Sequence, residues 1–118
     1  MLGGLVELAR ACRLDVRVTR SAIPVSDEAR AACALFGIDP YWTLSEGTLI
    51  VVARPAHASA VVAALKDEGI VVAEIGEVMR GTGVVWVAEP DGSSTTLTCA
   101  QPDPYWDAYD RAVREGWS

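Results

Sequence analysis

The sequence lacks the motifs from which most catalytic sites are recognised. It contains one histidine, His57, and one lysine, Lys66. It has no Gly-rich dinucleotide or phosphate loop, no Gly-x-Ser-x-Gly turn and no His-Glu-x-x-His motif. Lys66 stands beside two acids, which favours a solvated role over a phosphate clamp, and a histidine without an evident partner is typical of a structural or exposed position. The motifs therefore predict no catalytic residue and no metal ligand.

Positive charge and long apolar runs are also scarce. Ten Lys and Arg against sixteen Asp and Glu give a formal net charge of −6. This balance argues against a nucleic-acid surface and disfavours binding to anionic membranes. No apolar run reaches the roughly 18–20 residues of a membrane-spanning helix, and no secretory signal is visible. We therefore expect a cytoplasmic protein with no nucleic-acid or membrane partner.

The three cysteines, Cys12, Cys33 and Cys99, are an odd number and lie far apart. None forms a Cys-x-x-Cys pair, which argues against a disulfide framework or a structural zinc site. We expect all three to be small buried apolar residues in a reducing compartment.

What the sequence does contain is enough apolar surface for a packed core. Of its 118 residues, 51% are hydrophobic and 22% are charged, which are ordinary globular values. The length predicts a single domain over residues 1–118, with a tail at 100–118.

Hydrophobic periodicity and the residues typical of helix ends and turns predict an α+β fold of order α-β-α-β-α-β-β-β-α. The helices are indicated by apolar residues at helical spacing, by Ser26 as an N-cap, and by Gly37 and Gly69 as C-terminal residues. The strands are indicated by polar–apolar alternation or by runs of β-branched residues. Asp91-Gly92 predicts the turn of a hairpin, and Gly76 a bulge. Helices between the early strands imply parallel crossovers, and the late strands a meander, so we expect a mixed sheet with helices on at least one face. The predicted helices cover 5–14, 26–36, 55–69 and 105–114, and the predicted strands cover 15–19, 48–53, 70–78, 84–87 and 94–98.

Two short features can be read either as ligand sites or as ordinary structure. Gly3-Gly4 precedes the first predicted helix, where backbone amides can cradle a phosphate, although a glycine pair is also typical of a flexible terminus. The turn at 44–48 carries Glu46 and Gly47 just before an apolar strand. Its carboxylate could hold a magnesium ion or a substrate hydroxyl. It could equally be solvated, in a turn where Gly47 adopts positive φ.

Most aromatic residues fall in connections or near the last helix. Some must cover the sheet, and any that are exposed would form a partner surface, because Trp and Tyr supply much of the energy in interfaces. The residues concerned are Tyr41, Trp42, Tyr105, Trp106, Tyr109 and Trp117.

An ordered series of short motifs resembles the C-terminal domain of the aminoimidazole ribonucleotide (AIR) synthase superfamily, also called the PurM superfamily. The branch that it resembles most contains the hydrogenase maturation factor HypE and AIR-synthase-related proteins. The likeness runs from Gly3 to Val78. The motifs are GGL at 3–5, IPV at 23–25, EARAACALFGIDP at 28–40, SEGTL at 45–49 and IGEV at 75–78.

This resemblance implies an α/β domain with a β-α-β-α-β-β core and an ATP-dependent context. Enzymes of the superfamily use ATP to phosphorylate an amide, carbamoyl or related oxygen, which is then displaced. Their N-terminal domain supplies the main nucleotide- and magnesium-binding carboxylates and the dimer interface, and the C-terminal domain closes the cleft. Carried over residue by residue, the cofactor-binding positions are Gly3, Gly4, Glu46 and Gly47. ATP and Mg²⁺ are then expected only in a complete enzyme, and neither for this chain alone.

The sequence departs from the superfamily pattern at both ends. It begins almost at the Gly-Gly motif, so we expect the N-terminal half to lie outside this sequence, and Met1-Leu2 stands in place of the usual approach to the glycines. It ends Gly116-Trp117-Ser118, without the terminal cysteine that resembles the carbamoyl carrier of the hydrogenase factor, which leaves hydrogenase maturation unsupported.

Two functions from different classes follow. The first is a C-terminal domain that closes a nucleotide or substrate cleft and is inactive without an N-terminal AIR-synthase-like domain. The second is a stand-alone module that binds a small ligand or a protein without catalysis. A domain separated from its other half should expose the apolar patch that the other half covers, so the first reading also predicts a homo-oligomer formed through an edge strand.

Overall fold

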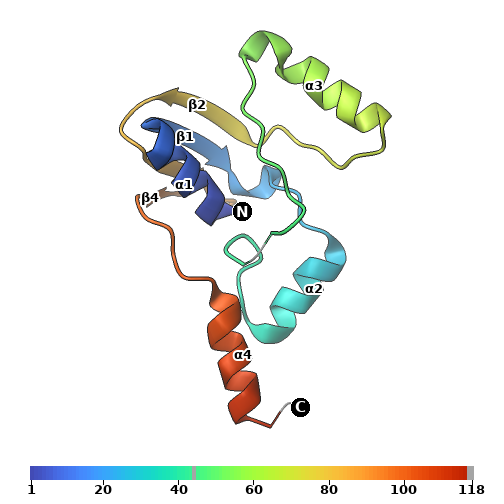
Figure 1. Cartoon of the computed structure of the whole chain (residues 1–118), viewed down its shortest axis with the longest axis vertical. Coiled ribbons are helices and arrows are strands. Elements are labelled where there is room, and N and C mark those ends of the chain that lie inside the picture. Colours follow the sequence, from blue (N-terminus) through green and yellow to red (C-terminus); the bar gives the residue numbers. More distant parts are fainter. Residues whose placement is uncertain (44, 117–118) are drawn as a thin grey trace.

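The computed structural model describes residues 1–43 and 45–116, and Figure 1 shows the arrangement of its elements. No helix in these two ranges is long and apolar enough to cross a membrane. The elements in chain order are α1 (Leu2–Cys12), β1 (Leu14–Thr19), the 3-10 turn η1 (Arg20–Ala22), α2 (Asp27–Phe36), α3 (Pro55–Asp67), β2 (Gly76–Arg80), β3 (Val85–Ala88), β4 (Ser94–Leu97) and α4 (Pro104–Arg114).

The four strands form one mixed sheet of order β2-β1-β3-β4. β1 runs parallel to β3, and the pairs β1–β2 and β3–β4 are antiparallel. The mixed sheet and the β3–β4 hairpin confirm the prediction. The parallel crossover expected between early strands is wrong for β1 and β2, which are antiparallel although α2 and α3 lie between them.

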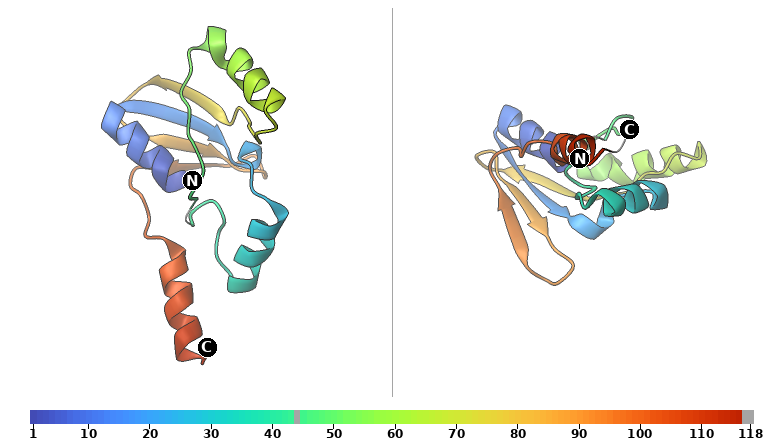
Figure 2. Two further views of the ribbon diagram at one scale, coloured as in Figure 1. Left: turned by 45° about the vertical axis from the view of Figure 1, so that its right-hand side comes forward. Right: turned by 90° about the horizontal axis from the view of Figure 1, so that it is seen from below.

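α1 lies across one face of the sheet, and the views in Figure 2 show no helix over the other face in the described part of the chain. The core is formed where α1 meets the alternate inward residues of β1 and β3, as their burial patterns show. Burial of apolar surface stabilises this packing by about 25 cal/mol for each Å² removed from water. The buried cluster comprises Leu2, Leu5, Val6, Ala9, Val16, Val18, Ile23, Tyr41, Val85, Val87 and Leu97.

The other helices begin and end at the residues that local chemistry favours. The Ser26 hydroxyl accepts a hydrogen bond from the Ala29 N–H at 3.2 Å, and Gly37 ends α2 with φ 65°. Pro55 occupies the first turn of α3. The Asp103 carboxylate accepts from the Tyr105 N–H at 2.9 Å and caps α4. The predictions for α2, α3 and α4 are therefore confirmed to within a few residues.

Two predicted strands are wrong in whole or in part. Residues 48–53 are not part of the sheet, and of the predicted strand 70–78 only the portion from Gly76 onward joins it. Gly76 is no bulge, since it pairs in register with Val18. β-Branched composition favours an extended backbone, but a strand also needs a partner edge. Residues 48–53 have none among the described residues, and in 70–75 only the Ile75 carbonyl bonds β1, accepting from the Thr19 N–H at 2.8 Å.

The cysteine and aromatic predictions hold only in part. Cys33 is buried, whereas Cys12 and Cys99 are exposed, so the expectation of three buried cysteines is wrong for two of them. Tyr41 joins the core. Tyr105, Trp106 and Tyr109 are exposed and contact one another on α4, with ring centroids 5.2–6.4 Å apart. Trp117 lies outside the described residues.

Candidate functional site

Gly3 and Gly4 lie inside the first turn of α1, not before it as the sequence predicted. The helix begins at Leu2, whose N–H donates to the carbonyl of Tyr41 at 2.9 Å. The amides of the two glycines have no carbonyl four residues earlier to bond, and we find no other acceptor for them in the described residues. A Cβ added at Gly3 would meet nothing within 4 Å, and one at Gly4 would meet only Ile50 Cδ1, at 3.4 Å. The core therefore does not require glycine at either position.

Glu46 and Gly47 form the tip of an exposed turn. The Thr48 N–H donates to the Ser45 carbonyl at 3.1 Å, and Gly47 has φ 77°, a value that side-chain-bearing residues rarely adopt. Glu46 is exposed and makes no ion pair or hydrogen bond with another described residue. The positive φ predicted for Gly47 is confirmed. The earlier part of this turn, at Leu44, lies outside the described residues.

Ile50 connects the two features, because it approaches Gly4 and packs against the core beneath α1. Ile50 is the third residue after Gly47, which limits the distance between their Cα atoms to about 10 Å. The turn that carries Glu46 therefore lies on the same side of the molecule as the start of α1. Gly4 and Glu46 are 42 positions apart in the sequence, and the fold brings the two features to one neighbourhood.

Arg20 holds the adjoining loop in place through contacts that sequence reasoning missed. Its guanidinium donates to the Asp39 carboxylate and, at 3.4 Å, to Glu89, and it lies 4.6 Å from the centre of the Tyr41 ring. Asp39 also accepts from the Tyr41 N–H at 2.9 Å. Burial lowers the pKa of Arg20, but these two carboxylates more than offset the effect and the pKa lies above its ordinary value. The network fixes the residues that meet the start of α1.

The partners of Arg20 lie 19 and 69 residues away along the chain, so no local pattern could reveal the network. From the sequence, Asp39 was noted only as a member of the motif at 28–40. In the structure its carboxylate accepts from the Tyr41 N–H and forms an ion pair with Arg20.

Another carboxylate, that of Asp15, organises the loop between β2 and β3. One oxygen accepts from the backbone N–H groups of Thr82, Gly83 and Val84 at 2.8–3.1 Å. The bonds from Val84 and Thr82 are the main cause of a pKa below the ordinary aspartate value. A Cβ at Gly81 would lie 2.0 Å from the carboxyl carbon, which explains the glycine there. This arrangement is structural, because the oxygen is already saturated with donors.

The groups near α1 suit part of a magnesium nucleotide and not the whole of it. Two free amides at the positive end of a helix dipole, with no side chain before them, are a fitting cradle for a phosphate oxygen. Magnesium prefers a set of carboxylate and water oxygens, and no group of three potential metal-ligating side chains exists among the described residues. The chain fits a phosphate contact and does not fit a metal site.

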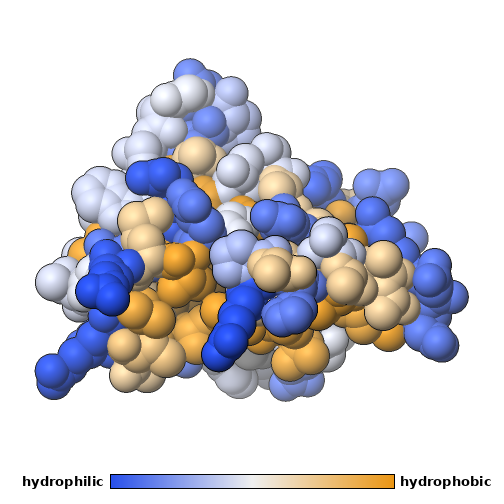
Figure 3. All heavy atoms as spheres, turned by 90° about the horizontal axis from the view of Figure 1, so that it is seen from above, coloured by the Kyte–Doolittle hydropathy of each residue, from blue (hydrophilic) through white to orange (hydrophobic). Residues whose placement is uncertain are grey.

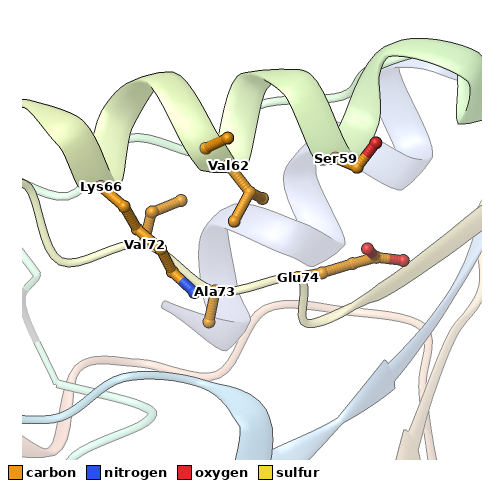
Figure 4. Close-up of a pocket in the computed structure, with 7 residues that line it drawn as sticks. Ser59, Val62, Lys66, Val72, Ala73 and Glu74 are labelled. Carbon is orange, nitrogen blue, oxygen red and sulfur yellow. The ribbon is translucent and has the colours of Figure 1, made fainter.

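A separate open groove lies between α3 and residues 72–74, as Figure 4 shows. It measures about 520 Å³ and is mostly apolar, with Lys66 and Glu74 as its charged groups. Neither the glycines of α1 nor Glu46 lines it. The groove has no paired nucleophile and base, so its chemistry is that of a binding surface.

The chain matches the family described as AIR synthase related protein, C-terminal domain, over residues 1–88. It is 38% identical over 81 residues to the carbamoyl dehydratase HypE of Bradyrhizobium diazoefficiens, covering 64% of this chain and 23% of that protein. It is 41% identical over 61 residues to HypE of Rhizobium leguminosarum bv. viciae, covering 52% of this chain and 17% of the relative. The crystal structure of HypE in complex with ATP superimposes with a TM-score of 0.74 at 28% identity, covering 85% of this chain and 32% of the other.

These likenesses extend over only part of each relative. The matches span about a fifth of the two curated proteins and about a third of the solved structure. The chain shares its fold with the C-terminal portion of such proteins, which confirms the resemblance inferred from the ordered motifs.

Proposed function

The chain belongs to the family of AIR synthase related proteins, whose C-terminal domain it carries, and from this membership we propose that it closes the nucleotide cleft of an ATP-dependent enzyme. In this role the amides of Gly3 and Gly4 contact a phosphate, and the turn of Glu46 and Gly47 lies at the ligand. The observation that supports the proposal is the start of α1, where the amides of Gly3 and Gly4 have no acceptor among the described residues and a Cβ added at Gly3 would meet nothing within 4 Å. A solved relative is complexed with ATP, which supports the choice of nucleotide.

The charged machinery for phosphoryl transfer must come from another polypeptide segment. Such transfer depends on metal-bridged, precisely positioned phosphates. The described residues offer no three-residue metal-ligating group, and the one arginine beside the site is already neutralised by Asp39 and Glu89. We therefore propose that the chain is inactive alone and works with an N-terminal AIR-synthase-like domain, in the cytoplasm. Mg²⁺ is then held mainly by that domain.

The decisive experiment adds the separately produced N-terminal portion of a HypE relative to this chain. With Mg-ATP, the chain alone should hydrolyse no ATP, and the mixture should hydrolyse ATP faster than the N-terminal portion alone. NMR signals of the Gly3 and Gly4 amides should shift on adding Mg-ATP to the mixture. Hydrolysis by the chain alone, or amide signals that stay unmoved in a mixture that forms a complex, contradicts the proposal.

Glu46 offers a matched comparison in the same assay. Glu46→Gln should lower the activity of the mixture, whereas Glu68→Gln, which changes another exposed glutamate after α3, should leave it unchanged. Equal effects of the two substitutions would remove Glu46 from the site.

The groove beside α3 favours a second candidate function, a module that binds a ligand or a protein without catalysis. Its apolar lining and its Lys66 and Glu74 rim suit an extended, weakly polar ligand. Val62→Asp should abolish such binding and leave the ATP assay unaffected. This outcome separates the two functions.

A further inference from the structure

Helix α3 stands apart from the segment that follows it and so forms one wall of the open groove. The groove measures about 520 Å³, which is an ordinary size for a binding site. Four residues at spacing i, i+3, i+4 and i+7 line it from one face of the helix, namely Ser59, Val62, Ala63 and Lys66. No residue of α3 is buried. The face that a helix normally packs against its own sheet is therefore available to another molecule.

The opposite wall of the groove is extended backbone. It consists of residues 72–74, which run back along α3 toward β2. From Val71 to Glu74 the backbone N–H and C=O groups make no hydrogen bond with another described residue. β2, which this segment enters at Gly76, is itself an edge strand of the sheet. Extended backbone with free donors and acceptors, continuous with an edge strand, is a template on which a further strand can pair.

The two charged side chains of the groove lie toward its opposite ends. Figure 4 shows Lys66 and Val72 at one end, and Ser59 and Glu74 at the other. Neither Lys66 nor Glu74 forms an ion pair with another described residue. The helical rise from Ser59 to Lys66 is about 10.5 Å, a distance that about four residues of extended strand would span. The groove therefore has the length of a short peptide segment, with one positive and one negative end.

We propose that this groove binds an extended peptide segment of another protein, which pairs antiparallel with residues 72–74 and packs one face against α3. Antiparallel pairing is somewhat more stable than parallel pairing. Residues 72–74 run from the Lys66 end to the Glu74 end. An antiparallel peptide therefore places its N-terminal part at Glu74 and its C-terminal part at Lys66.

This direction fixes the chemistry of the peptide. It carries a basic residue that faces Glu74 and, four positions later, an acidic residue that faces Lys66. In a strand these two side chains and the one midway between them share a face, so the middle residue is apolar and packs against Val62. The inference rests on the groove being a binding module, the second function proposed above, and is independent of the nucleotide role of α1.

Two peptides of one composition test the direction of binding. Arg-Thr-Val-Thr-Glu and its reverse, Glu-Thr-Val-Thr-Arg, are flanked by glycine, blocked at both ends, labelled with a fluorophore and titrated with the full chain. The first should bind about tenfold more tightly, because the reverse peptide places like charges at both ends. It should also slow hydrogen exchange at the amides of residues 71–74. Equal binding overturns the antiparallel mode and leaves a binding groove, whereas binding of neither peptide overturns the mode and the groove function together.

Matched alanine substitutions test the location. Ala63→Trp should raise the Kd of the first peptide by about tenfold or more, because the indole fills the groove. The control is Ala64→Trp, which adds the same side chain at the next residue of α3, outside the groove lining, and should change the Kd less than about twofold. Both alanines are exposed, so far-UV circular dichroism should show both variants folded. Equal weakening by the two variants overturns the location.

A charge swap tests the assignment of the two ends. Lys66→Glu alone and Glu74→Lys alone should each bind the two peptides about equally, since each leaves one favourable and one unfavourable charge contact in either peptide. The double variant exchanges the ends and should prefer the reverse peptide by about tenfold. A double variant that keeps the original preference overturns the assignment.

Two further outcomes assign the groove to a different occupant. Slow hydrogen exchange at residues 71–74 without any peptide, at every protein concentration, means that the chain itself fills the groove. Peptide binding that weakens as the chain's own concentration rises means that a second copy fills it. Either result overturns the proposal, and exchange at these amides that is fast without peptide and slow with the first peptide supports it.

Discussion

Two regions of the molecule differ sharply in how they are stabilised. The sheet unit, which comprises α1 and the four strands, contains nine of the eleven residues of the buried cluster. The outer region comprises α2, α3, α4 and the extended segments 45–53 and 70–75. In it, α3 has no buried residue, and α2 and α4 have one each. The sheet unit is therefore stabilised by core packing, and the outer region has little such packing.

The outer region is shaped by local signals rather than by packing. Its helices have side-chain caps or a proline in the first turn, yet isolated helices of 10–13 residues are marginal in water. The radius of gyration is 15.9 Å, against about 13.5 Å for a compact chain of this length. Apolar side chains reach the surface between charged ones on the side that carries α3 (Figure 3). Such a region is suited to being covered by a partner.

The largest effect is expected in the sheet unit, where Gly76→Ala would push β1 and β2 apart. A Cβ there would lie 2.0 Å from the Arg17 carbonyl oxygen and 2.8 Å from the Val18 Cα, so backbone must move. We expect Gly76→Ala to cost about 4 kcal/mol or more in the free energy of unfolding, measured by urea denaturation.

Gly3→Ala is the matched control, because a Cβ at Gly3 meets nothing within 4 Å and the residue is helical. It should stabilise the protein by about 0.5 kcal/mol, since alanine is the better helix former. Similar losses for the two glycines would mean that the strands tolerate separation at Gly76.

The second prediction compares one leucine in each region. Leu5→Ala removes a side chain that is 3% exposed beneath the sheet and should cost about 3 kcal/mol. Leu35→Ala in α2 should cost less than about 0.5 kcal/mol. Both values come from denaturation at low protein concentration, where association does not contribute. A cost at Leu35 near that at Leu5 would show that α2 is packed in solution.

The same division explains what could be predicted from sequence. Helix ends depend on neighbours within four residues, so Ser26, Gly37 and Pro55 located them well. Residues 48–53 were predicted as a strand because their β-branched composition favours extended backbone, but sheet membership depends on a distant partner edge. The Gly3–Gly4 and Glu46–Gly47 features were found in the sequence as possible ligand sites or ordinary structure, and only the family resemblance assigned them to cofactor binding. The Arg20 network was missed, because its partners are 19 and 69 residues away.

Arg20 connects the sheet unit to the loop that enters the outer region, and its removal should have the third largest effect. Its side chain is 23% exposed and contacts Asp39 and Glu89. Arg20→Ala should cost about 2 kcal/mol, because it leaves two half-buried carboxylates without their partner. Arg17→Ala breaks an ion pair in which both side chains are 62% exposed and should cost less than about 0.5 kcal/mol. Thermal unfolding of both variants measures the difference, which a more compact denatured state of Arg20→Ala would reduce.

The smallest effect concerns pH and Asp15, which fastens the β2–β3 loop of the sheet unit. Its folded pKa is depressed by the backbone N–H groups of Val84 and Thr82, whereas the unfolded chain has the ordinary aspartate value near 4. The unfolded state therefore takes up a proton first as pH falls. The stabilisation that Asp15 provides is complete above about pH 4 and is lost as pH falls through the folded pKa.

Asp15→Asn should accordingly lower the melting temperature at pH 7 and flatten its decline between pH 5 and the acid limit, because the amide does not titrate. Asp67 lies in the last turn of α3, and its side chain makes no hydrogen bond with another described residue, so Asp67→Asn should keep the original melting profile. Parallel profiles for Asp15→Asn and the unmodified protein would show that the three amides bind the neutral side chain as well as the carboxylate. The acid response of the molecule would then arise outside the sheet unit, and the contrast between the two regions would be weaker than their burial implies.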